Sequence, residues 1–455
     1  MDSQRYGQQD LIKFAINVLI KGGLPQNQAK AAARILVEAD LRGDHAHGIA
    51  GGVGLDDILI KVNDDEKQLG FKRIRIPGNN EDYEFKQPYD TVIIVDAKGF
   101  LGHYVALDIT PKVIQIAKRF GVGKAYIRNS THFGDCGIYS EIIAHNDLAA
   151  RVTCTSSQWT KPFVELQDKQ DTGSSFNLNR YRGVRKRFGT NPLAWSIPYD
   201  GGIITIDMAS TQRAVSPAIA VGKFNAKELQ ITQDNAGINC IGKGEKKKKL
   251  TEDLHLSIAR SESVEQLYEK LSHLGYDNTI NVKPVEKGLL KGPHGEDITY
   301  PIAFDRTFKK YFWIAPLGGT FFGYKGFGIN TLIELDNVIG GGTTGLIREL
   351  DKNEDPKTPE RVSQTIEAYA IDVLYPLEVA KAKLGESVKM TKDCGNDLLY
   401  LPGQKEQETK KEYLARGIPM TPDRIKKLKA IASEVGISFK PKAIKNHSSL
   451  KGLNG

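Results

Sequence analysis

The sequence predicts a mixed α/β fold that is not of the Rossmann type. Residues 125–163 contain an apolar run, a polar turn, a segment with helical spacing and a second run rich in Val and Thr, which indicates strand, turn, helix and strand. Residues 10–20 and the alanine-rich residues 26–39 predict two helices. A G-x-G-x-x-G pattern at residues 340–345 follows an expected helix instead of opening a strand-to-helix turn, so we interpret it as a helix cap and loop.

Taken in order, the chain begins with an amphipathic helix, which Gly22-Gly23 ends. Its apolar face consists of Leu11, Phe14, Val18 and Leu19. Residues 64–88 are polar and contain glycine and proline, so we expect a peripheral excursion. Residues 91–95 predict a strand. Residues 101–119 predict a helix, in which Pro111 marks a kink or a new start.

Later elements follow the same rules of spacing and termination. Residues 192–197 and 203–206 predict neighbouring strands joined by a glycine turn. Residues 263–274 predict a helix that Ser263 caps and Gly275 ends. We expect the remaining elements to be a helix at 329–338, a strand at 365–374 and helices at 378–384, 404–416 and 422–435.

Composition is that of a soluble globular protein. The 455 residues are 40% hydrophobic and 26% charged, and they can bury a core large enough for two or three subdomains. We expect no membrane segment, because no long apolar run occurs, and the N-terminus lacks the features of a signal peptide. A cytoplasmic location is therefore expected. Free thiols in a reducing compartment are predicted for the four dispersed cysteines, which are Cys136, Cys154, Cys240 and Cys394.

The net charge of +8 does not by itself indicate a nucleic-acid partner. The charge is spread along the chain except at residues 245–249, where one glutamate precedes four lysines. We interpret this run as a solvated loop, and no nucleic-acid motif accompanies it. A basic balance can also attract anionic substrates and dinucleotides.

Four titratable residues lie at positions that suit catalysis or ligand binding. His132 lies on a loop just past a strand end, where it serves catalysis or only hydrogen-bonds the turn. His45 and His47 lie between two glycines, and a metal site would need a third ligand that the sequence does not supply. Asp207 ends a strand, and on the sequence alone it is equally a cap for the next turn. No metal is predicted.

Five stretches, in order along most of the chain, resemble the malate/L-lactate dehydrogenase family that does not use a Rossmann fold. That family includes sulfolactate, ureidoglycolate and diketogulonate oxidoreductases and reductases of cyclic imine carboxylates. The stretches are Asn-Ser-Thr-His-Phe-Gly at 129–134, residues 39–48, residues 189–193 with 206–209, residues 316–319 with the glycine–lysine turn at 323–328, and residues 401–403 with 415–419.

The resemblance implies a role for each matching residue. His47, directly before a glycine, would be the proton donor and acceptor, and Asp207 would orient it or tune its charge. His132 and Lys325 would line the cleft for substrate and cofactor. The residues implied to contact NAD or NADP are Gly189, Thr190, Asn191, Pro192, Lys325, Gly403, Gln404 and Lys405. The chain departs from the family at Ala46, where serine is usual, and near Gly51, where an arginine usually grips the substrate carboxylate.

The resemblance also implies the architecture. It predicts a mainly antiparallel sheet domain for the cofactor, paired with a helical domain, in a homodimer. We assign residues 1–120, joined by residues 320–455, to the helical substrate domain. Residues 121–319 form the NAD(P)-binding sheet domain. The insertions expected in it lie at about 165–187 and 235–300, and we interpret the second as a surface subdomain or a partner-binding element.

Two functions are compatible with these observations. The first is an NAD(P)-dependent oxidoreductase that passes a hydride between nicotinamide and a small 2-hydroxy or 2-oxo acid, or a cyclic imine acid. The second is a catalytically inactive family member that acts as a structural or interaction protein. The missing arginine, Ala46 and the insertions favour the second function. The presence of His47, Asp207 and Lys325, together with His132, favours the enzyme.

Overall fold

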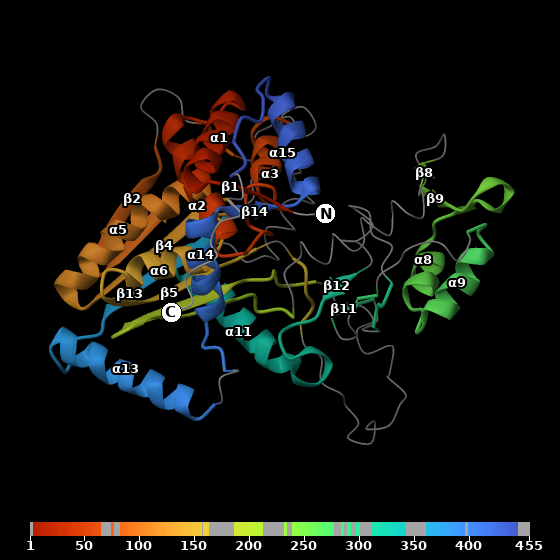
Figure 1. Ribbon diagram of the computed structural model, residues 1–455. Helices are drawn as coiled ribbons and strands as arrows, with labels where there is room; N and C mark the ends of the chain where they lie inside the picture. Colours follow the sequence, from red (N-terminus) through yellow and green to blue (C-terminus); the bar gives the residue numbers. More distant parts are fainter. Residues whose placement is uncertain are drawn as a thin grey trace, which may run out of the picture.

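The computed structural model of the protein describes residues 3–64, 74–76, 82–156, 158–162, 186–212, 232–233, 239–276, 284–285, 289–292, 297–300, 312–342, 361–395 and 399–444. These residues form a seven-stranded sheet, a helical unit that packs beside it and a small helix pair that stands apart from both (Figure 1).

The sheet is mainly antiparallel, with strand order β2-β3-β4-β13-β5-β6-β7. Among these described strands only β3 and β4 run parallel, and the other neighbours are antiparallel. A Rossmann sheet is parallel, so this topology confirms the predicted non-Rossmann fold. The strands are β2 (Glu84–Tyr89), β3 (Val92–Asp96), β4 (Val122–Ser130), β5 (Leu148–Cys154), β6 (Leu193–Tyr199), β7 (Gly202–Met208) and β13 (Val362–Ala370).

Strand β13 brings the C-terminal third of the chain into the centre of the sheet. It lies between β4 and β5, and its Thr365 pairs with Tyr126 on one side and Thr153 on the other. Five consecutive residues from Val362 are buried, as expected for a strand covered on both faces. The pairing fixes the end of β4, from which the turn carrying His132 departs.

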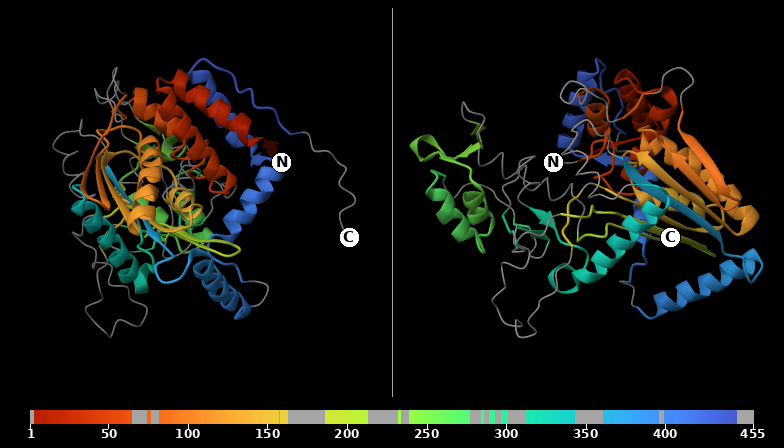
Figure 2. Two further views of the ribbon diagram at one scale, coloured as in Figure 1. Left: turned by 90° about the vertical axis from the view of Figure 1, so that its left-hand side faces the viewer. Right: turned by 180° about the vertical axis from the view of Figure 1, so that it is seen from behind.

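Helices cover both faces of the sheet (Figures 1 and 2). Helices α5 (Gly102–Phe120) and α6 (Cys136–Ala144) pack on one face and α11 (Gly319–Ile339) and α13 (Leu377–Asp393) lie on the other. Helix α5 continues through Pro111, so of the kink and the new helix start expected there as alternatives, the new start is wrong. A proline inside a helix costs about 3 kcal/mol. Burial of ten α5 residues against the sheet and its neighbours outweighs that cost.

The helical unit holds a second core. The predicted apolar face of α1 is confirmed, because Leu11, Val18 and Leu19 are fully buried and Phe14 nearly so. Strands β1 and β14 pair antiparallel and join the first described residues to the C-terminal region. The elements are α1 (Gln8–Lys21), α2 (Gln26–Leu41), α3 (Leu55–Leu59), the π-helix η1 (Ile60–Asp64), α15 (Pro422–Glu434), β1 (Gln4–Tyr6) and β14 (Ile418–Met420).

The helix pair that stands apart comprises α8 (Glu252–Ala259) and α9 (Val264–Ser272). The Oγ atom of Ser263 accepts a hydrogen bond from the Gln266 N–H, which confirms the predicted cap. Residues 245–249 are exposed, as expected for a solvated lysine run. The short elements near this pair are β8 (Thr232–Gln233), β9 (Asn239–Ile241), the 3₁₀ helix η2 (Gly244–Lys246), β10 (Lys248–Lys249), β11 (Leu290–Lys291) and β12 (Trp313–Ile314).

The predicted glycine–lysine turn is wrong, because residues 323–328 lie inside α11. Gly326 packs against the backbone of Leu317, where a Cβ atom would overlap the Leu317 main chain. The glycine therefore allows a close approach and does not form a turn. Gly340 caps the C-terminus of α11, as the G-x-G-x-x-G pattern predicted, whereas residues 343–345 lie outside the described part.

Two other expectations fall partly outside the described residues. Of the loop expected at 165–187, only the last two residues are described. The excursion expected at 64–88 ends in β2, an edge strand in which every residue is exposed, so residues 84–88 are peripheral as expected but belong to the sheet. Strands β2 and β3, which precede residue 121, belong to the sheet, and α5, which also precedes it, packs on the sheet. The predicted division of the chain at residue 121 stays a prediction.

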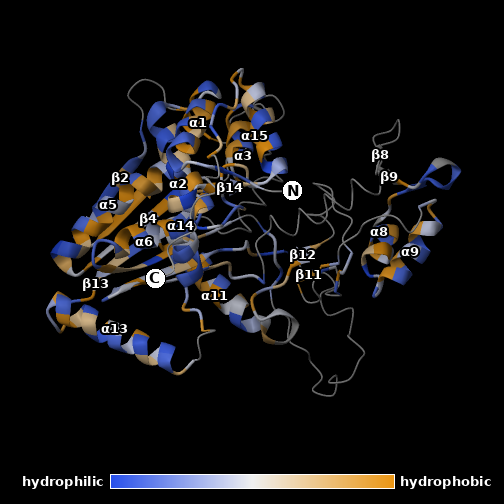
Figure 3. Cartoon of the chain, viewed as in Figure 1, coloured by the Kyte–Doolittle hydropathy of each residue, from blue (hydrophilic) through white to orange (hydrophobic). Residues whose placement is uncertain are grey.

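Hydropathy follows the layers of the fold (Figure 3). Apolar residues gather where α1, α2, α5 and α6 face one another and the sheet, whereas α14 (Gln404–Arg416) is almost entirely hydrophilic and has no buried residue. Within the described ranges, no helix combines the length and the apolar character needed to cross a membrane.

Candidate active site

Three histidines from separate parts of the chain meet beside the sheet, and we call them the histidine row. His47 follows α2, His132 follows β4 and His103 lies in the first turn of α5. The rings of His47 and His132 are stacked, with centroids 5.6 Å apart and planes 11° apart. The His103 ring lies 6.2 Å from that of His132. The structure thus brings the two predicted catalytic histidines together and adds a third.

A buried carboxylate holds the loop that carries His47. Asp40, at the end of α2, is fully buried and accepts a hydrogen bond of 3.0 Å from the backbone N–H of Ile49. It also contacts the His45 ring at 2.9 Å and pairs with Arg424 of α15. These bonds close the segment from 40 to 49 into a fixed turn, with the His47 side chain on it.

Asp44 is the hydrogen-bond partner of His47. Its Oδ2 lies 2.5 Å from Nδ1 of the imidazole. Burial alone would lower the pKa of His47, but the hydrogen bond and the negative charge of Asp44 outweigh burial and raise that pKa. Because Nδ1 is engaged, Nε2 is the atom through which His47 can exchange a proton with a ligand.

The other two histidines are held neutral. Burial, helped by the charges of His47 and Lys61, places the pKa of His132 well below its ordinary value. Burial and the charge of Lys61 lower the pKa of His103 to about 3. The backbone N–H of Gly134 donates to Nδ1 of His132 at 3.1 Å, so the neutral ring carries its proton on Nε2. The site therefore joins one chargeable imidazole to two neutral ones.

A pair of buried carboxylates lies at the N-terminus of α6. The Gly137 N–H donates to both Asp135, at 2.8 Å, and Asp207, at 2.7 Å. Burial and the neighbouring Asp135 raise the pKa of Asp207 well above its usual range. Burial opposes ionisation of Asp135 too, but hydrogen bonding to Asp207 and the charge of Arg42 lower its pKa to about 2. Asp207 is therefore the protonated member and donates to Asp135.

Arg42 links this carboxylate pair to the loop of His47. It follows α2 directly, is 6% exposed, lies 3.4 Å from Asp135 and pairs with Glu141 of α6. A side chain at Gly137 would crowd Arg42 and Asp207, so glycine is required there. In the described part of the structure, Asp44 bonds to His47, whereas Asp207 bonds to Asp135 and Gly137. A role for Asp207 in supporting His47 stays a prediction.

The first predicted cofactor segment, residues 189–192, is held between the sheet and α11. The fully buried Asn191 donates to Asn330 at 2.6 Å and to Glu334 at 2.9 Å. Its side-chain amide oxygen accepts from the Ser156 N–H at 2.8 Å, and the Thr190 N–H donates to the Ser156 hydroxyl at 2.8 Å. Gly189 and Pro192 flank these anchored residues in the segment that leads into β6.

The second predicted cofactor segment begins α14. Gly403 precedes that helix with a φ of +81°, and its backbone lies against Thr205 of β7. Gln404 is partly buried and accepts from the Leu401 N–H at 3.1 Å, and Lys405 is exposed. Lys325 is exposed on α11, where its ammonium lies 5.5 Å from the Phe322 ring. Binding of a dinucleotide by these residues stays a prediction.

Sequence reasoning missed several residues of this site. Arg42 and Asp44 lie inside the motif at 39–48, and Asp135 follows His132 by three positions, so proximity in sequence could have suggested them. His103 and Lys61 carry no sequence signal, because only the fold brings them to His132. No group of acidic, histidine or cysteine side chains suited to a metal occurs among the described residues.

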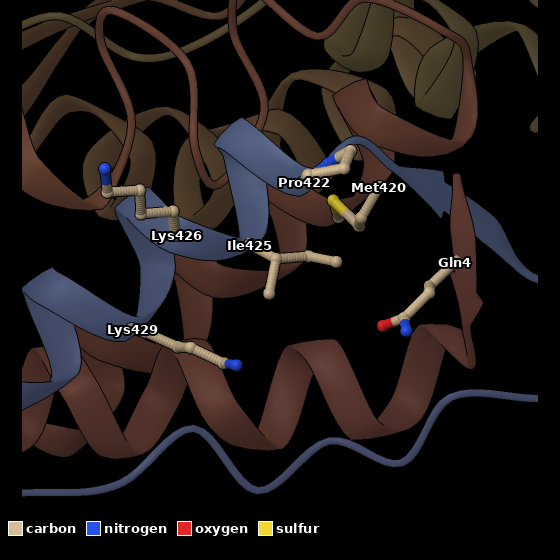
Figure 4. A pocket seen from close by; sticks show the side chains of 6 residues that line it. All are labelled: Gln4, Met420, Pro422, Ile425, Lys426 and Lys429. Atoms are coloured by element: carbon tan, nitrogen blue, oxygen red, sulfur yellow. The ribbon is translucent and has the colours of Figure 1, made fainter. Parts of the chain in front are cut away.

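A pocket of about 390 Å³ lies on the helical unit, where β1 and β14 meet α15 (Figure 4). Its walls are Gln4, Met420, Pro422, Ile425, Lys426 and Lys429. These walls include no histidine and no carboxylate, and none of them belongs to the histidine row.

Comparison with known proteins agrees with the motifs. A family model described as malate/L-lactate dehydrogenase matches residues 7–168 and 279–429, which is more than half of the chain. The malate dehydrogenase of Pyrococcus abyssi is 24% identical over 452 residues, covering 95% of each chain. The malate/(S)-sulfolactate dehydrogenase of Methanothermus fervidus is 24% identical over 431 residues, covering 93% of this chain and 96% of the relative.

Solved structures share the fold. The malate dehydrogenase of Entamoeba histolytica superposes with a TM-score of 0.67 at 20% identity, covering 96% of this chain and 99% of the other. Residues 169–278, which the family model leaves unmatched, contain α8 and α9. The helix pair that stands apart in Figure 1 thus lies outside the residues that the family model matches.

Proposed function

Because this chain belongs to the malate/L-lactate dehydrogenase family, we propose that it is an NAD(P)-dependent oxidoreductase acting on a small 2-hydroxy or 2-oxo acid. The observation that carries the proposal is the stacked pair of His47 and His132, in which one imidazole is chargeable and the other is neutral. Reduction of a 2-oxo acid needs a hydride at C2 and a proton at the keto oxygen, and the pair is suited to the proton half.

In this proposal His47 supplies the proton through Nε2. Asp44 holds the opposite ring nitrogen at 2.5 Å and favours the imidazolium, which donates to the keto oxygen during reduction. Neutral His47 accepts the proton back when the hydroxy acid is oxidised. His132 donates from Nε2 toward the substrate and cannot compete for the proton, because its pKa is low. Each imidazole thus has one task.

A bound nicotinamide would supply the hydride chemistry. The residues that would hold its dinucleotide are those of the two anchored segments: Gly189, Thr190, Asn191, Pro192, Gly403, Gln404 and Lys405, with Lys325 nearby along α11. The donor set fits an anionic dinucleotide, because the N-terminus of α14 and the exposed ammonium of Lys405 suit phosphates. Either NAD or NADP can satisfy these groups.

We include a homodimer in the proposal. Helix α11 presents three apolar residues at helical spacing, and Leu332, Leu335 and Ile339 are 69%, 55% and 72% exposed. The same helix carries Asn330 and Glu334, which anchor the cofactor segment at Asn191. A second copy on this face would therefore cover the apolar residues and stiffen the cofactor segment.

The test is a fluorescence titration of the full-length protein with NADH and with NADPH, followed by turnover of a panel of 2-oxo acids. Micromolar affinity for either coenzyme together with turnover is the expected result. Coenzyme binding without turnover of any acid would favour the inactive family member instead. Absence of binding to both coenzymes, by a protein with a cooperative melting transition, would refute the oxidoreductase.

A further inference from the structure

A 2-oxo acid brings a carboxylate into the site, and a buried carboxylate is costly without a cation. The sequence has no arginine near Gly51, and the structure leaves no room for a side chain at Gly51 itself. A Cβ atom on Gly51 would overlap the carbonyl group of Ala46 and lie 2.8 Å from the carbonyl oxygen of His45. The cation must therefore come from another position.

Three basic residues near the His47 loop are committed elsewhere. Arg42 pairs with Glu141 and lies 3.4 Å from Asp135. Arg424 pairs with the buried Asp40. Lys427 donates to the Gly51 carbonyl at 3.1 Å and lies 3.6 Å from Asp56 near the surface.

Lys61 is placed differently, because it lines a small pocket together with two histidines of the row. The pocket walls are Val53, Asp57, Ile58, Lys61, Ile74, Leu101, His103, Thr131 and His132. Lys61 is only 8% exposed and lies 2.8 Å from Asp57. Its charge lowers the pKa of both His132 and His103, so the field of the ammonium reaches the row.

His103 gives an independent sign that this pocket receives a ligand. Its side chain is 1% exposed, and neither ring nitrogen has a hydrogen-bond partner among the described residues. A buried polar group without a partner carries a free-energy cost, because it has lost its hydrogen bonds to water. A neutral imidazole can donate one hydrogen bond to an anion, which would remove that cost.

Resting on the proposed function, we propose that Lys61 is the cation that binds the substrate carboxylate, with neutral His103 as a hydrogen-bond donor beside it. The His132 ring neighbours both groups, with its centroid 5.6 Å from that of His47 and 6.2 Å from that of His103. In this proposal a 2-oxo acid directs its keto oxygen to His47 and its carboxylate to Lys61.

Binding requires the Lys61 side chain to move. The pocket is nearly closed by its own side chains, and the four-carbon stem of lysine is its most adaptable wall. Among the described walls of the pocket Asp57 is the only carboxylate, and the incoming carboxylate competes with it for the ammonium. The Lys61 ammonium thus either leaves Asp57 for the substrate carboxylate or is shared between the two carboxylates. His103 and His132 are neutral and add no charge to the subsite.

The chain offers a matched control for Lys61. Lys112 forms the same ion pair, with an aspartate four residues earlier, at the same distance of 2.8 Å. It lies on α5, the helix that carries His103, but it is part of an exposed pair and not a wall of the pocket. Replacement of either lysine by methionine removes one charge and one such pair.

The experiment is a calorimetric titration of oxamate, an unreactive mimic of a 2-oxo acid, into the full-length protein alone and with saturating NADH or NADPH. We expect Lys61→Met to weaken oxamate binding at least about tenfold, Lys61→Arg to stay within about threefold, and Lys112→Met to match the wild type. Unchanged coenzyme affinity and melting temperature would show that each variant is folded.

Equal oxamate affinity of wild type and Lys61→Met would overturn the inference, as would absence of oxamate binding by the wild type in every condition. A loss with Lys427→Met instead of Lys61→Met would overturn it as well. Turnover of 2-oxo acids tests the proposed reaction independently of oxamate binding. Oxamate binding that depends on Lys61, in a protein that turns over no 2-oxo acid, would support the anion subsite and refute the oxidoreductase.

Discussion

His47 and His132 lie face to face with ring centroids 5.6 Å apart, and their surroundings shift their pKa values in opposite directions. Asp44 raises the pKa of His47 over the effect of burial, whereas burial and the charge of His47 lower that of His132. A proton in this pair therefore resides on His47. The direction of proton transfer in the proposed reaction follows from this asymmetry.

The first prediction concerns pH. Reduction needs the imidazolium of His47, so kcat/KM for reduction falls as pH rises through the pKa of His47, and oxidation shows the opposite trend. Asp44→Asn removes the charge that raises this pKa, because burial then dominates. The decline in reduction should move to lower pH. Asp56→Asn changes a carboxylate that pairs with Lys427 and not with a histidine of the row, and it should leave the profile in place. An unmoved profile in Asp44→Asn would refute the assignment.

The second prediction compares the stability of Asp207→Asn and Asp135→Asn, measured by urea denaturation at pH 7. Asp207 is protonated, so Asp207→Asn keeps a neutral donor to Asp135 and should change the free energy of unfolding by less than about 1 kcal/mol. Asp135→Asn removes the anion beside the buried Arg42 and should cost roughly 3 kcal/mol. The reverse order would show that Asp207 is the ionised member.

The same pair predicts a response to acid. The pKa of Asp135 is about 2 in the folded protein, below its ordinary value of 3.8. Its contribution to stability is therefore complete above 3.8 and is lost as pH falls toward about 2. Asp135→Asn should remove this part of the acid dependence, which denaturation between pH 5 and pH 2 would measure.

The third prediction tests the packing at Gly51. Gly51→Ala should destabilise the protein by about 1–3 kcal/mol, because its Cβ atom would overlap the Ala46 carbonyl. Gly328→Ala is the control, since that helical glycine has open space around it and should gain up to about 1 kcal/mol. Equal unfolding free energies of the two variants would contradict the close approach at Gly51.

The fourth prediction addresses the homodimer by light scattering on a sizing column. Leu335→Asp on α11 should yield a monomer with weaker coenzyme affinity, because the face it disrupts adjoins the anchors of Asn191. Val373→Asp changes a residue that is 85% exposed outside that helix, and it should leave the dimer intact. A wild type that is monomeric at micromolar concentration would contradict the dimer proposal.

Local patterns predicted much of this fold, because helix faces and strand alternation depend on near neighbours. The apolar face of α1, the Ser263 cap and the extent of α14 all follow from such patterns. The insertion of β13 between β4 and β5 depends on pairing across two hundred residues, which a single sequence does not reveal. Glycines in α11 misled the prediction, because glycine serves close packing as well as turns.

The candidate site divides in the same way. Motif resemblance pointed to His47 and His132, and the structure places them in one stack. It pointed to Asp207 as well, but Asp44 is the residue that bonds to His47. His103 and Lys61 join the site only through the packing of α5 and η1 against the end of β4, so no motif could have announced them.

The most direct test of the central claim follows a deuterium label. NADH or NADPH with deuterium at both C4 positions of nicotinamide is incubated with the protein and a panel of 2-oxo acids, and the masses of the products are measured by mass spectrometry. We predict a 2-hydroxy acid that carries the label at C2, formed at least about 100-fold more slowly by His47→Gln. Absence of a labelled hydroxy acid from every substrate, with folded wild-type protein, would contradict the claim that this site transfers hydride.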